Sequence, residues 1–305
     1  MEWGLTGVFV VLFVLSYARE PRAMKCAVFL FGAVASLVLS LIGMIGVSFY
    51  LILVFVLPYI IPLDDTVKVD LIYAPPSLTH PFGFDSQGKD VFSQIVHGGR
   101  ELIAVAVGAA VVSTLVGTAL GGFSGVLGGK VDSSLMLLTD VWLTIPQLPL
   151  LIVMAAFIRV SGPATLILII GLLSWASLTR AVRAQVLSIK ERDFVEAARV
   201  LDLGTTHIVT REVLPNMVSY LTINFILAIT SAMYFQTALV FLGLVPLAGT
   251  NWGIMLRFAY TRGAIFARDS FWYIMAPVLA ISFFQLSLVA LERGVAEVFN
   301  PRLRS

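Results

Sequence analysis

The chain has 305 residues, of which 59% are hydrophobic and only 12% are charged, and its net charge is +2. An average soluble domain carries about 25% charged residues, so this composition excludes a soluble globular protein and a disordered chain. It predicts a protein that crosses the membrane several times. The small net charge gives no indication of nucleic-acid binding. The single cysteine, Cys26, excludes an internal disulfide and a cysteine-based metal cluster, and no two histidines have metal-ligand spacing.

Seven stretches free of Asp, Glu, Lys and Arg are candidate membrane helices, since a spanning helix needs roughly 20 mostly apolar residues. They cover residues 3–18, 26–63, 102–129, 141–158, 160–179, 213–256 and 270–291. We therefore expect an all-α polytopic membrane protein with about seven spans. Residues 1–25 would form an N-terminal membrane helix and a basic inside loop, and residues 26–305 the main transmembrane domain.

The stretch 26–63 is longer than one membrane crossing requires. It is either a single long helix that projects beyond the bilayer, or two passes that turn near Gly43 and Gly46. We favour the single helix, because a turn there would contain no charged or strongly polar residue. In the stretch 213–256 we expect a helix from about 216 to 242, followed by a loop that stays apolar.

The distribution of basic residues predicts the orientation of the chain, because short cytoplasmic loops carry an excess of Lys and Arg. With the loop 19–25 inside and the spans alternating, inside segments hold 13 Lys and Arg residues and outside segments hold 7. This places the N-terminus outside, the C-terminus in the cytoplasm, and the protein in the plasma membrane. Two segments between spans are long: 64–101 on the outside and 180–212 on the inside.

The outer segment contains Gly83, Gly88 and Lys89 at the spacing of a phosphate-binding loop. The next residue, however, is Asp90 rather than Ser or Thr, no strand precedes the loop, and its predicted location is extracellular. The hydroxyl that would bind Mg²⁺ is therefore missing. We expect a glycine-supported turn rather than a nucleotide site, so that any ATP hydrolysis would come from a partner.

Four glycines recur at every fourth residue of the third candidate span. They are Gly117, Gly121, Gly125 and Gly129. This spacing predicts a flat seam of the small-xxx-small kind, which lets membrane helices approach closely. The seam would pack either inside this subunit or against a second membrane subunit. We favour packing inside the subunit, because that is the commoner use of the pattern.

Asp140 is the only acidic residue well inside an apolar segment, and an intramembrane carboxylate is a candidate functional group. We favour a gate or a packing hydrogen bond over a proton relay, because a proton-coupled carrier would show more than one such group. Uncharged polar side chains of the spans are candidates for lining a pathway or for bonding to neighbouring helices: Ser113, Thr114, Thr144, Gln147, Asn224, Thr230, Ser231, Gln236 and Thr237. An aromatic belt is expected near the outer boundary from Trp252, Phe271, Trp272 and Tyr273.

The inner segment 188–213 contains the pattern of a short amphipathic helix that would lie parallel to the cytoplasmic face. Its apolar positions recur at i, i+3, i+4 and i+7, on one face of a helix: Phe194, Ala197, Ala198 and Leu201. Small side chains in the middle of this face permit close approach, as helix-in-groove docking requires. Periodicity leaves open two alternatives, a helix lying on lipid headgroups and a helix folded back on its own bundle.

The ends of this helix carry their own signals. Ser188 and Glu191 have the spacing of an N-terminal capping box. The sequence Asp202-Leu-Gly204 predicts the end of the helix, because Gly is the preferred left-handed residue at that place. A second short helix is expected from about 205 to 213.

At this segment the sequence resembles a known family. Glu196-Ala197-Ala198, followed by Leu214-Pro215-Asn216, is similar to the EAA loop of ABC-importer permeases. From about residue 45 onward the chain resembles the second, C-type permease subunit of dipeptide, oligopeptide and nickel importers. Further matches, in chain order, are His80-Pro81-Phe-Gly83-Phe-Asp85-Ser-Gln-Gly88-Lys89-Asp90, Gly128-Gly129-Lys-Val-Asp132, Thr144-Ile145-Pro146, Phe241-Leu242-Gly243-Leu244, Trp252-Gly253-Ile-Met-Leu256 and Asn300-Pro301-Arg302. Their order and spacing together are highly specific.

The chain also departs from the family pattern. Asp202 stands where the family usually has Gly, Phe84 where Thr is usual, and Lys89 where Arg is usual. The candidate span 3–18 is an addition to the family's usual six helices.

The resemblance implies the transmembrane domain of an ABC type I importer. Such a subunit forms half of a translocation channel together with a homologous second permease subunit. Its other partners would be two ATPase subunits, which bind ATP and Mg²⁺, an extracellular solute-binding protein facing the outer loops, and membrane lipid. The chain itself would bind no cofactor and would not be an enzyme. The implied cargo is peptides, with oligosaccharides or nickel as further possibilities.

The resemblance also implies that the helix of the EAA loop inserts into a cleft of the ATPase subunit. From side-chain size and charge we expect Glu196 to be the polar contact, Ala197 and Ala198 the close-packing face, and Phe194 or Leu201 the anchors. The turn at Gly204 would end the docking helix.

Two other classes of function remain as alternatives. A secondary transporter coupled to an ion gradient would need ion or proton sites and inverted repeats, whereas the chain offers Asp140 alone and no clear repeat. An intramembrane hydrolase would need a nucleophile and a base. All three histidines fall in predicted loops, so this class has the weaker support.

Overall fold

The computed structural model describes residues 22–158, 160–245 and 249–299. The longer helices are α2 (Arg22–Phe55), α3 (Val91–Leu127), α4 (Gly129–Thr144), α5 (Gln147–Phe157), α6 (Pro163–Leu173), α7 (Trp175–Ile189), α8 (Asp193–Val200), α10 (Val218–Leu242), α11 (Trp252–Thr261) and α12 (Phe271–Phe299). The short α9 (Thr205–His207) continues into a π-helical turn, Ile208–Val213, and a 3₁₀ turn, Leu214–Met217. Within these ranges no strand is present, which confirms the all-α prediction.

Four helical segments are long and apolar enough to cross a membrane: Leu37–Tyr59, Val91–Leu127, Thr205–Leu242 and Phe271–Ala296. Two sharply bent helix pairs, α4 with α5 and α6 with α7, raise the number of candidate spans to six if each pair is one span. The chain is therefore a multi-pass membrane protein. The seventh predicted span, 3–18, lies outside the described residues, and the count of seven stays a prediction.

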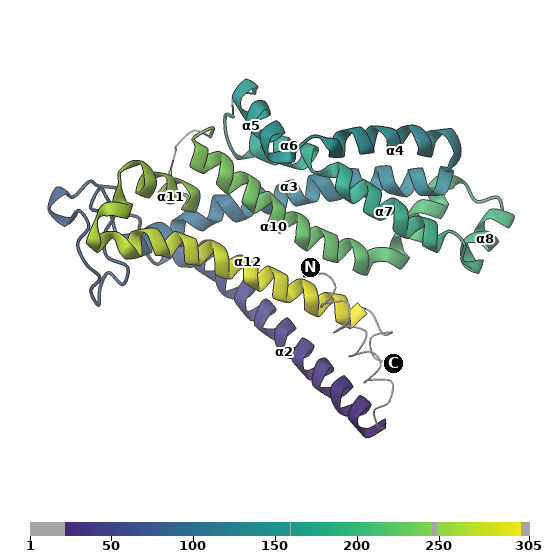
Figure 1. Cartoon of the computed structure of the whole chain (residues 1–305), viewed down its shortest axis with the longest axis horizontal. Helices are drawn as coiled ribbons and strands as arrows, with labels where there is room; N and C mark the ends of the chain where they lie inside the picture. The colour runs from purple at the N-terminus through teal and green to yellow at the C-terminus, as the bar shows by residue number, and fades with distance from the viewer. Residues whose placement is uncertain (1–21, 159, 246–248, 300–305) are drawn as a thin grey trace, which may run out of the picture.

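Most of the stretch 26–63 lies in one long helix, α2, which ends at Phe55 and confirms the favoured of the two predictions. Gly43 and Gly46 do not form a turn. A Cβ at Gly43 would collide with the backbone of Leu291, and one at Gly46 would collide with Ser287. These glycines therefore let α2 and α12 lie side by side, as Figure 1 shows.

The predicted span 141–158 is wrong in its boundaries and its shape. Helix α4 begins twelve residues earlier, at Gly129, and an 86° bend at Ile145 and Pro146 separates it from α5. Proline lacks a backbone N–H and disfavours helical geometry at the preceding residue, and Ile145 accordingly has ψ of 123°. The predicted span 160–179 is likewise divided by a 46° bend at Ser174.

Helix α3 is the centre of the bundle and packs against α2, α6, α7, α10 and α12. It begins at Val91 rather than at 102, so the last part of the predicted outer segment 64–101 is helical. Near its start it packs on Trp252, whose indole Nε1 donates a hydrogen bond of 2.9 Å to the carbonyl of Ile95. A Cβ at Gly98 or Gly99 would crowd the Trp252 side chain.

The predicted aromatic belt is only partly present. Trp252 and Tyr273 are core residues, 0% and 2% exposed, whereas Phe271 and Trp272 are exposed. Trp252, the first residue of α11, is buried against α3, and Gly253 packs closely on Val240 of α10, which together account for the Trp-Gly pair of the sequence motif. Two of the four aromatic residues therefore stabilise helix packing instead of contacting an interface.

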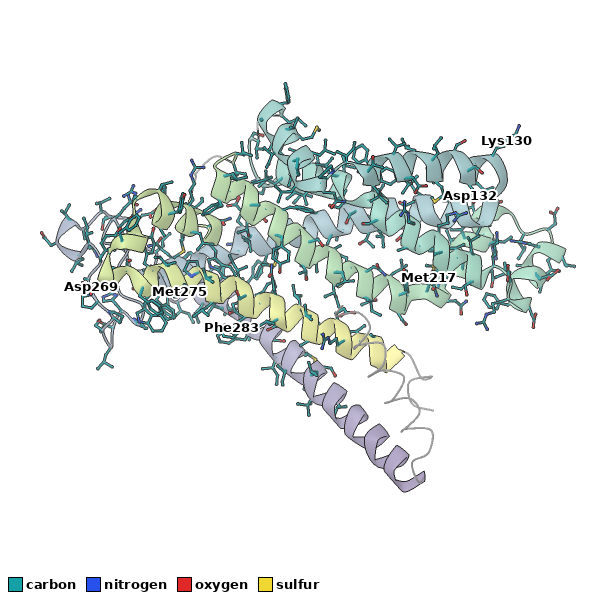
Figure 2. The ribbon with its side chains drawn as sticks, viewed as in Figure 1. Lys130, Asp132, Met217, Asp269, Met275 and Phe283 are labelled. Atoms are coloured by element: carbon teal, nitrogen blue, oxygen red, sulfur yellow. The ribbon has the colours of Figure 1, made fainter. Side chains whose placement is uncertain are left out.

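The structure groups the predicted inside and outside segments at opposite ends of the bundle. Helix α8 and the turn between α3 and α4 lie at one end, and the loops before α3 lie with α11 at the other (Figure 1). Lys130 and Asp269 mark these two ends in Figure 2. This agrees with the division derived from basic residues. Which end faces the cytoplasm stays a prediction.

Candidate functional site

Helix α8, at the predicted cytoplasmic end, is shorter than the sequence pattern indicates. It begins after Arg192, whose carbonyl accepts hydrogen bonds from the N–H groups of Val195 (2.9 Å) and Glu196 (3.2 Å). Ser188 belongs instead to the last turn of α7, which ends at Ile189. The predicted capping box of Ser188 and Glu191 is therefore wrong, because two helices meet where periodicity predicted one.

The end of α8 is a Schellman motif built on an aspartate. The N–H of Leu203 bonds the carbonyl of Ala198 at 3.1 Å, and the N–H of Asp202 bonds that of Arg199 at 2.9 Å. Asp202 has φ of 54° and is the left-handed residue. Gly204 is extended, with φ of −60°, and starts α9. The helix stop is confirmed, but Asp202 rather than Gly204 provides it, as its place in the family pattern suggests.

One side of α8 packs on its own subunit. Val195 and Ala198 are buried, in a cluster with Val186 of α7 and with Ile208 and Val213 of the π-helical turn. Ala198, which was predicted to form a close-packing face with Ala197, thus packs on its own subunit in this structure. Its burial shows that the reading of a helix folded back on its own bundle is correct for one side.

A second side of α8 is exposed and apolar. Phe194, Ala197 and Leu201 are all exposed, and Leu201 retains 71% of its accessible surface. We call these three residues the coupling face; they lie about a quarter turn from the buried pair. Glu196 is also exposed, and its carboxylate has no hydrogen bond or ion pair within the described residues. Helix α8 is thus held to its own subunit on one side and exposes apolar side chains and a charged carboxylate on the other.

The glycine seam on α3 packs inside the subunit, which confirms the favoured prediction. A Cβ at Gly117 would lie 2.9 Å from Leu178, one at Gly121 2.5 Å from the carbonyl of Thr179, and one at Gly125 2.7 Å from Val186. All three partners are on α7. Gly129 does not belong to the seam: it has φ of 58° at the turn into α4, and a Cβ there would touch nothing within 4 Å.

Ion pairs between α4 and α7 were not predicted. Arg183 pairs with Asp132, which also accepts a hydrogen bond of 2.5 Å from Ser124 at the end of α3. Asp140 pairs with Arg180, which lies one helical turn before Arg183 on α7. Both side chains of this pair are more than half exposed. Asp140 thus forms an ion pair between α4 and α7, and its role as a gate or packing group rather than a proton relay stays a prediction. No local pattern in the sequence signals these pairs, because their partners are 40 and 51 positions apart.

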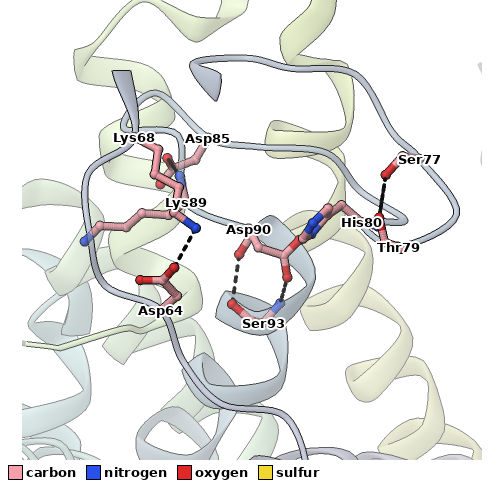
Figure 3. A network of polar contacts seen from close by, with 9 residues as sticks. All are labelled: Asp64, Lys68, Ser77, Thr79, His80, Asp85, Lys89, Asp90 and Ser93. Atoms are coloured by element: carbon pink, nitrogen blue, oxygen red, sulfur yellow. Dashed lines mark hydrogen bonds and ion pairs between the residues drawn. The ribbon is translucent and has the colours of Figure 1, made fainter. Parts of the chain in front are cut away.

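The glycine-rich motif of the outer segment forms a folded loop at the start of α3 (Figure 3). Asp85 is 4% exposed and accepts hydrogen bonds from the backbone N–H groups of Gln87 (2.7 Å) and Lys89 (2.9 Å) and from the amide of Gln94 (2.9 Å). The N–H groups that would cradle a phosphate are therefore already bonded to a carboxylate. Gly88 has φ of 68°, as the predicted glycine-supported turn requires.

Asp90 caps the first turn of α3. Its carboxylate accepts a hydrogen bond of 2.8 Å from the N–H of Ser93 and contacts His80 Nδ1 at 3.1 Å. Gly83, with φ of 66°, packs so closely on the carbonyl of Ala74 that a Cβ would lie 2.5 Å away. Gly83, Asp85, Gly88 and Asp90 are thus brought together as a structural unit that fixes the outer loop on α3.

One ion pair holds the preceding loop against this unit, and a second lies within that loop. Lys89 Nζ lies 2.8 Å from Asp65, and Lys68 Nζ lies 2.6 Å from Asp64. The hydrogen bonds from Lys68 and then from Thr66 hold the pKa of the Asp64 carboxyl well below its usual range. Lys89 is therefore engaged with a carboxylate and not with a free anion site.

A hollow of about 340 Å³ opens between α3, α5, α7 and α10. Four of the nine predicted pathway residues line it: Ser113, Gln147, Asn224 and Ser231. The structure adds Ser174 and Ser177, which periodicity gave no reason to select. The other five lie elsewhere: Thr114, Thr144, Thr230, Gln236 and Thr237. Among these, the hydroxyls of Thr144 and Thr230 bond to carbonyls of their own helices, and Gln236 is fully buried.

The geometry thus combines a polar hollow, a packed α3–α7 contact and an exposed helix at one end. A protein-family model described as "binding-protein-dependent transport system inner membrane component" matches residues 117–305. The chain belongs to this family. The permease is therefore a membrane subunit of an ABC importer, and the resemblance drawn from its motifs is confirmed.

Its relatives carry consistent names. A putative peptide permease protein of Brucella ovis is 35% identical over 229 residues, which cover 74% of the permease and 74% of the relative. A dipeptide transport system permease protein of Bacillus subtilis is 28% identical over 269 residues, covering 87% and 82%. An oligopeptide transport system permease protein of the same organism is 29% identical over 233 residues, covering 75% and 74%. Proteins of this kind form channels, and the family works with binding-protein and ATPase partners.

Proposed function

We propose that the permease forms half of a peptide channel and that α8 transmits the motion of a separate ATPase to it. The observation that carries the proposal is the coupling face: Phe194, Ala197 and Leu201 are exposed on a helix whose other side is fixed by Val195 and Ala198. An amphipathic helix of this kind fits a groove on a partner. Glu196, which has no partner in the described chain, would supply the polar contact.

The contacts of α8 suggest how its displacement reaches the channel. Ala198 and Val195 share a cluster with Val186 and Leu178 of α7. Leu178 lies over Gly117 of α3 and also lines the hollow. Tightly packed interiors transmit displacement because they have few voids to absorb it. A movement of α8 would therefore shift α7 along the glycine seam and change the shape of the hollow.

Peptides are the cargo that the relatives' names support. The complex would contain this permease, a homologous second permease and two ATPase subunits, with ATP and Mg²⁺ bound by the ATPases. An extracellular binding protein would dock on the outer loops, at the end of the bundle that carries the Asp85 unit. The C-terminus would lie in the cytoplasm, on the same side as α8.

A charge reversal on α8 tests this function. We expect Glu196→Lys to weaken co-purification of the ATPase subunit about tenfold, the effect of about 1.4 kcal/mol from one lost charged contact. The matched control is Asp70→Lys, since Asp70 is an exposed acidic residue at the other end of the bundle. Equal ATPase recovery with both variants, together with normal ATP-driven uptake, would show that α8 is not the contact.

A further inference from the structure

We propose that the hollow between α3, α5, α7 and α10 is a subsite for the backbone amide groups of a peptide in transit. This rests on the proposed function and extends it, because it states what the channel wall recognises. The hollow has the size of a small-molecule site, about 340 Å³ against the usual range of roughly 300–1,000 Å³. It is open on one side, where Ser177 and Ser231 are exposed.

The polar side chains of the hollow are hydroxyls and amides. They are Ser113, Gln147, Ser174, Ser177, Asn224 and Ser231. The apolar lining consists of Leu178, Ala181, Leu227, Ala228 and Phe235. Of the described residues that line the hollow, none is charged, and none is His or Cys. A free carboxylate or ammonium would find no counter-charge here, and a nickel ion would find neither imidazole nor thiolate.

The hydrogen-bonding capacity of the lining matches an amide. Ser113 and Ser174 donate to carbonyls of their own helices, so their hydroxyl oxygens remain acceptors. Gln147, Ser177 and Ser231 make no side-chain hydrogen bond within the described ranges, so they retain both donors and acceptors. A peptide group offers one N–H donor and one C=O acceptor. Gln147, with an amide of its own, can satisfy both at once.

The position of the hollow connects this recognition to the movement of α7. Ser174 lies at the 46° bend between α6 and α7, and Ser177 follows one helical turn later. The next residue, Leu178, packs on the glycine seam. A shift of α7 therefore moves two of the six polar lining groups relative to Gln147 and Ser231. Backbone amides would be bound in one arrangement of the helices and released in the other.

Thiol protection in the assembled complex tests the subsite. In a Cys26→Ser background, Ser231→Cys is labelled with N-ethylmaleimide in the presence of triglycine or of its fully N-methylated analogue trisarcosine. We expect triglycine to slow labelling and trisarcosine, which lacks amide donors, to leave it unchanged. Adding Gln147→Leu should weaken the protection about five- to tenfold, as expected for one lost hydrogen bond. The control Thr222→Cys, also on α10 but outside the hollow, should react equally in all conditions.

Two results would overturn the subsite: no slowing by triglycine, or equal slowing by both peptides. ATP-driven uptake of triglycine by the unmodified complex in proteoliposomes separates this from the proposed function. Uptake without thiol protection would contradict the subsite proposal alone. Absence of uptake for peptides that the binding protein delivers would contradict the proposed peptide channel.

Discussion

Arg183 of α7 holds Asp132 of α4 in a two-point ion pair, with its Nε and Nη2 each 2.5 Å from a different carboxylate oxygen. Ser124 of α3 donates to the same carboxylate. Three helices thus meet at one acidic side chain, close to the end of the bundle that carries α8. Lys190, which follows the last residue of α7, adds a bond of 3.3 Å to the carbonyl of Gly125. This end of α7 is therefore bonded to α3 directly and to α4 through Asp132.

Loss of this pair should destabilise the helix junction. We expect Arg183→Gln to lower the free energy of unfolding by about 1–3 kcal/mol, because Asp132 is 14% exposed and would lose its counter-charge. Arg180→Gln is the matched control: its pair with Asp140 is more than half exposed and should contribute less than about 1 kcal/mol. Thermal unfolding in detergent would compare them, and equal shifts would contradict the assigned difference.

The glycine seam predicts opposite effects for two neighbouring substitutions. Gly121→Ala should destabilise the permease by about 1–3 kcal/mol, because its Cβ would lie 2.5 Å from the Thr179 carbonyl and force α3 from α7. Gly122→Ala places its Cβ 3.4 Å from Val209, an ordinary contact. It should be neutral or slightly stabilising, since Ala favours helices by about 1 kcal/mol. Unfolding curves of the two variants, measured in parallel, test this difference. Destabilisation by Gly122→Ala alone would contradict close packing of α3 on α7 at Gly121.

The left-handed residue after α8 can be tested in the same way. Asp202 has φ of 54°, so Asp202→Gly should stabilise this turn by about 0.5–1 kcal/mol, and Asp202→Val should destabilise it by more than that. Gly204→Ala should be nearly neutral, because Gly204 has φ of −60°. Hydrogen exchange of the Leu203 amide reports on the turn directly. Strong destabilisation by Gly204→Ala would place the left-handed residue at 204 after all.

Hydrophobic runs and glycine spacing sufficed to predict the membrane class, the single long helix at 26–63, the intramolecular seam and the helix at 216–242. These features depend on local composition or on repeats along one helix. The bends at Pro146 and Ser174 were missed because the length of a charge-free stretch does not show where the helix within it changes direction. The Asp132–Arg183 pair was missed because it joins residues 51 positions apart, a separation that no local pattern records.

The face of α8 shows the limit of periodicity most clearly. Phe194, Ala197, Ala198 and Leu201 fit one stripe, yet Ala198 is buried with Val195 while the other three are exposed. A stripe identifies the apolar positions, whereas the π-helical turn that follows decides which of them the subunit covers. Periodicity likewise does not show which polar side chains of different helices meet in space, and only four of the nine predicted pathway residues line the hollow.

Cysteine cross-linking from the two sides of α8 tests the central claim most directly. In a Cys26→Ser background, Leu201→Cys and Ala198→Cys would each be treated with a short bifunctional maleimide in membranes that contain the assembled importer. A transmitting helix docked through its coupling face predicts a covalent adduct with the ATPase subunit from Leu201→Cys and none from Ala198→Cys. An adduct from Ala198→Cys alone, or no ATPase adduct from Leu201→Cys, would contradict the account.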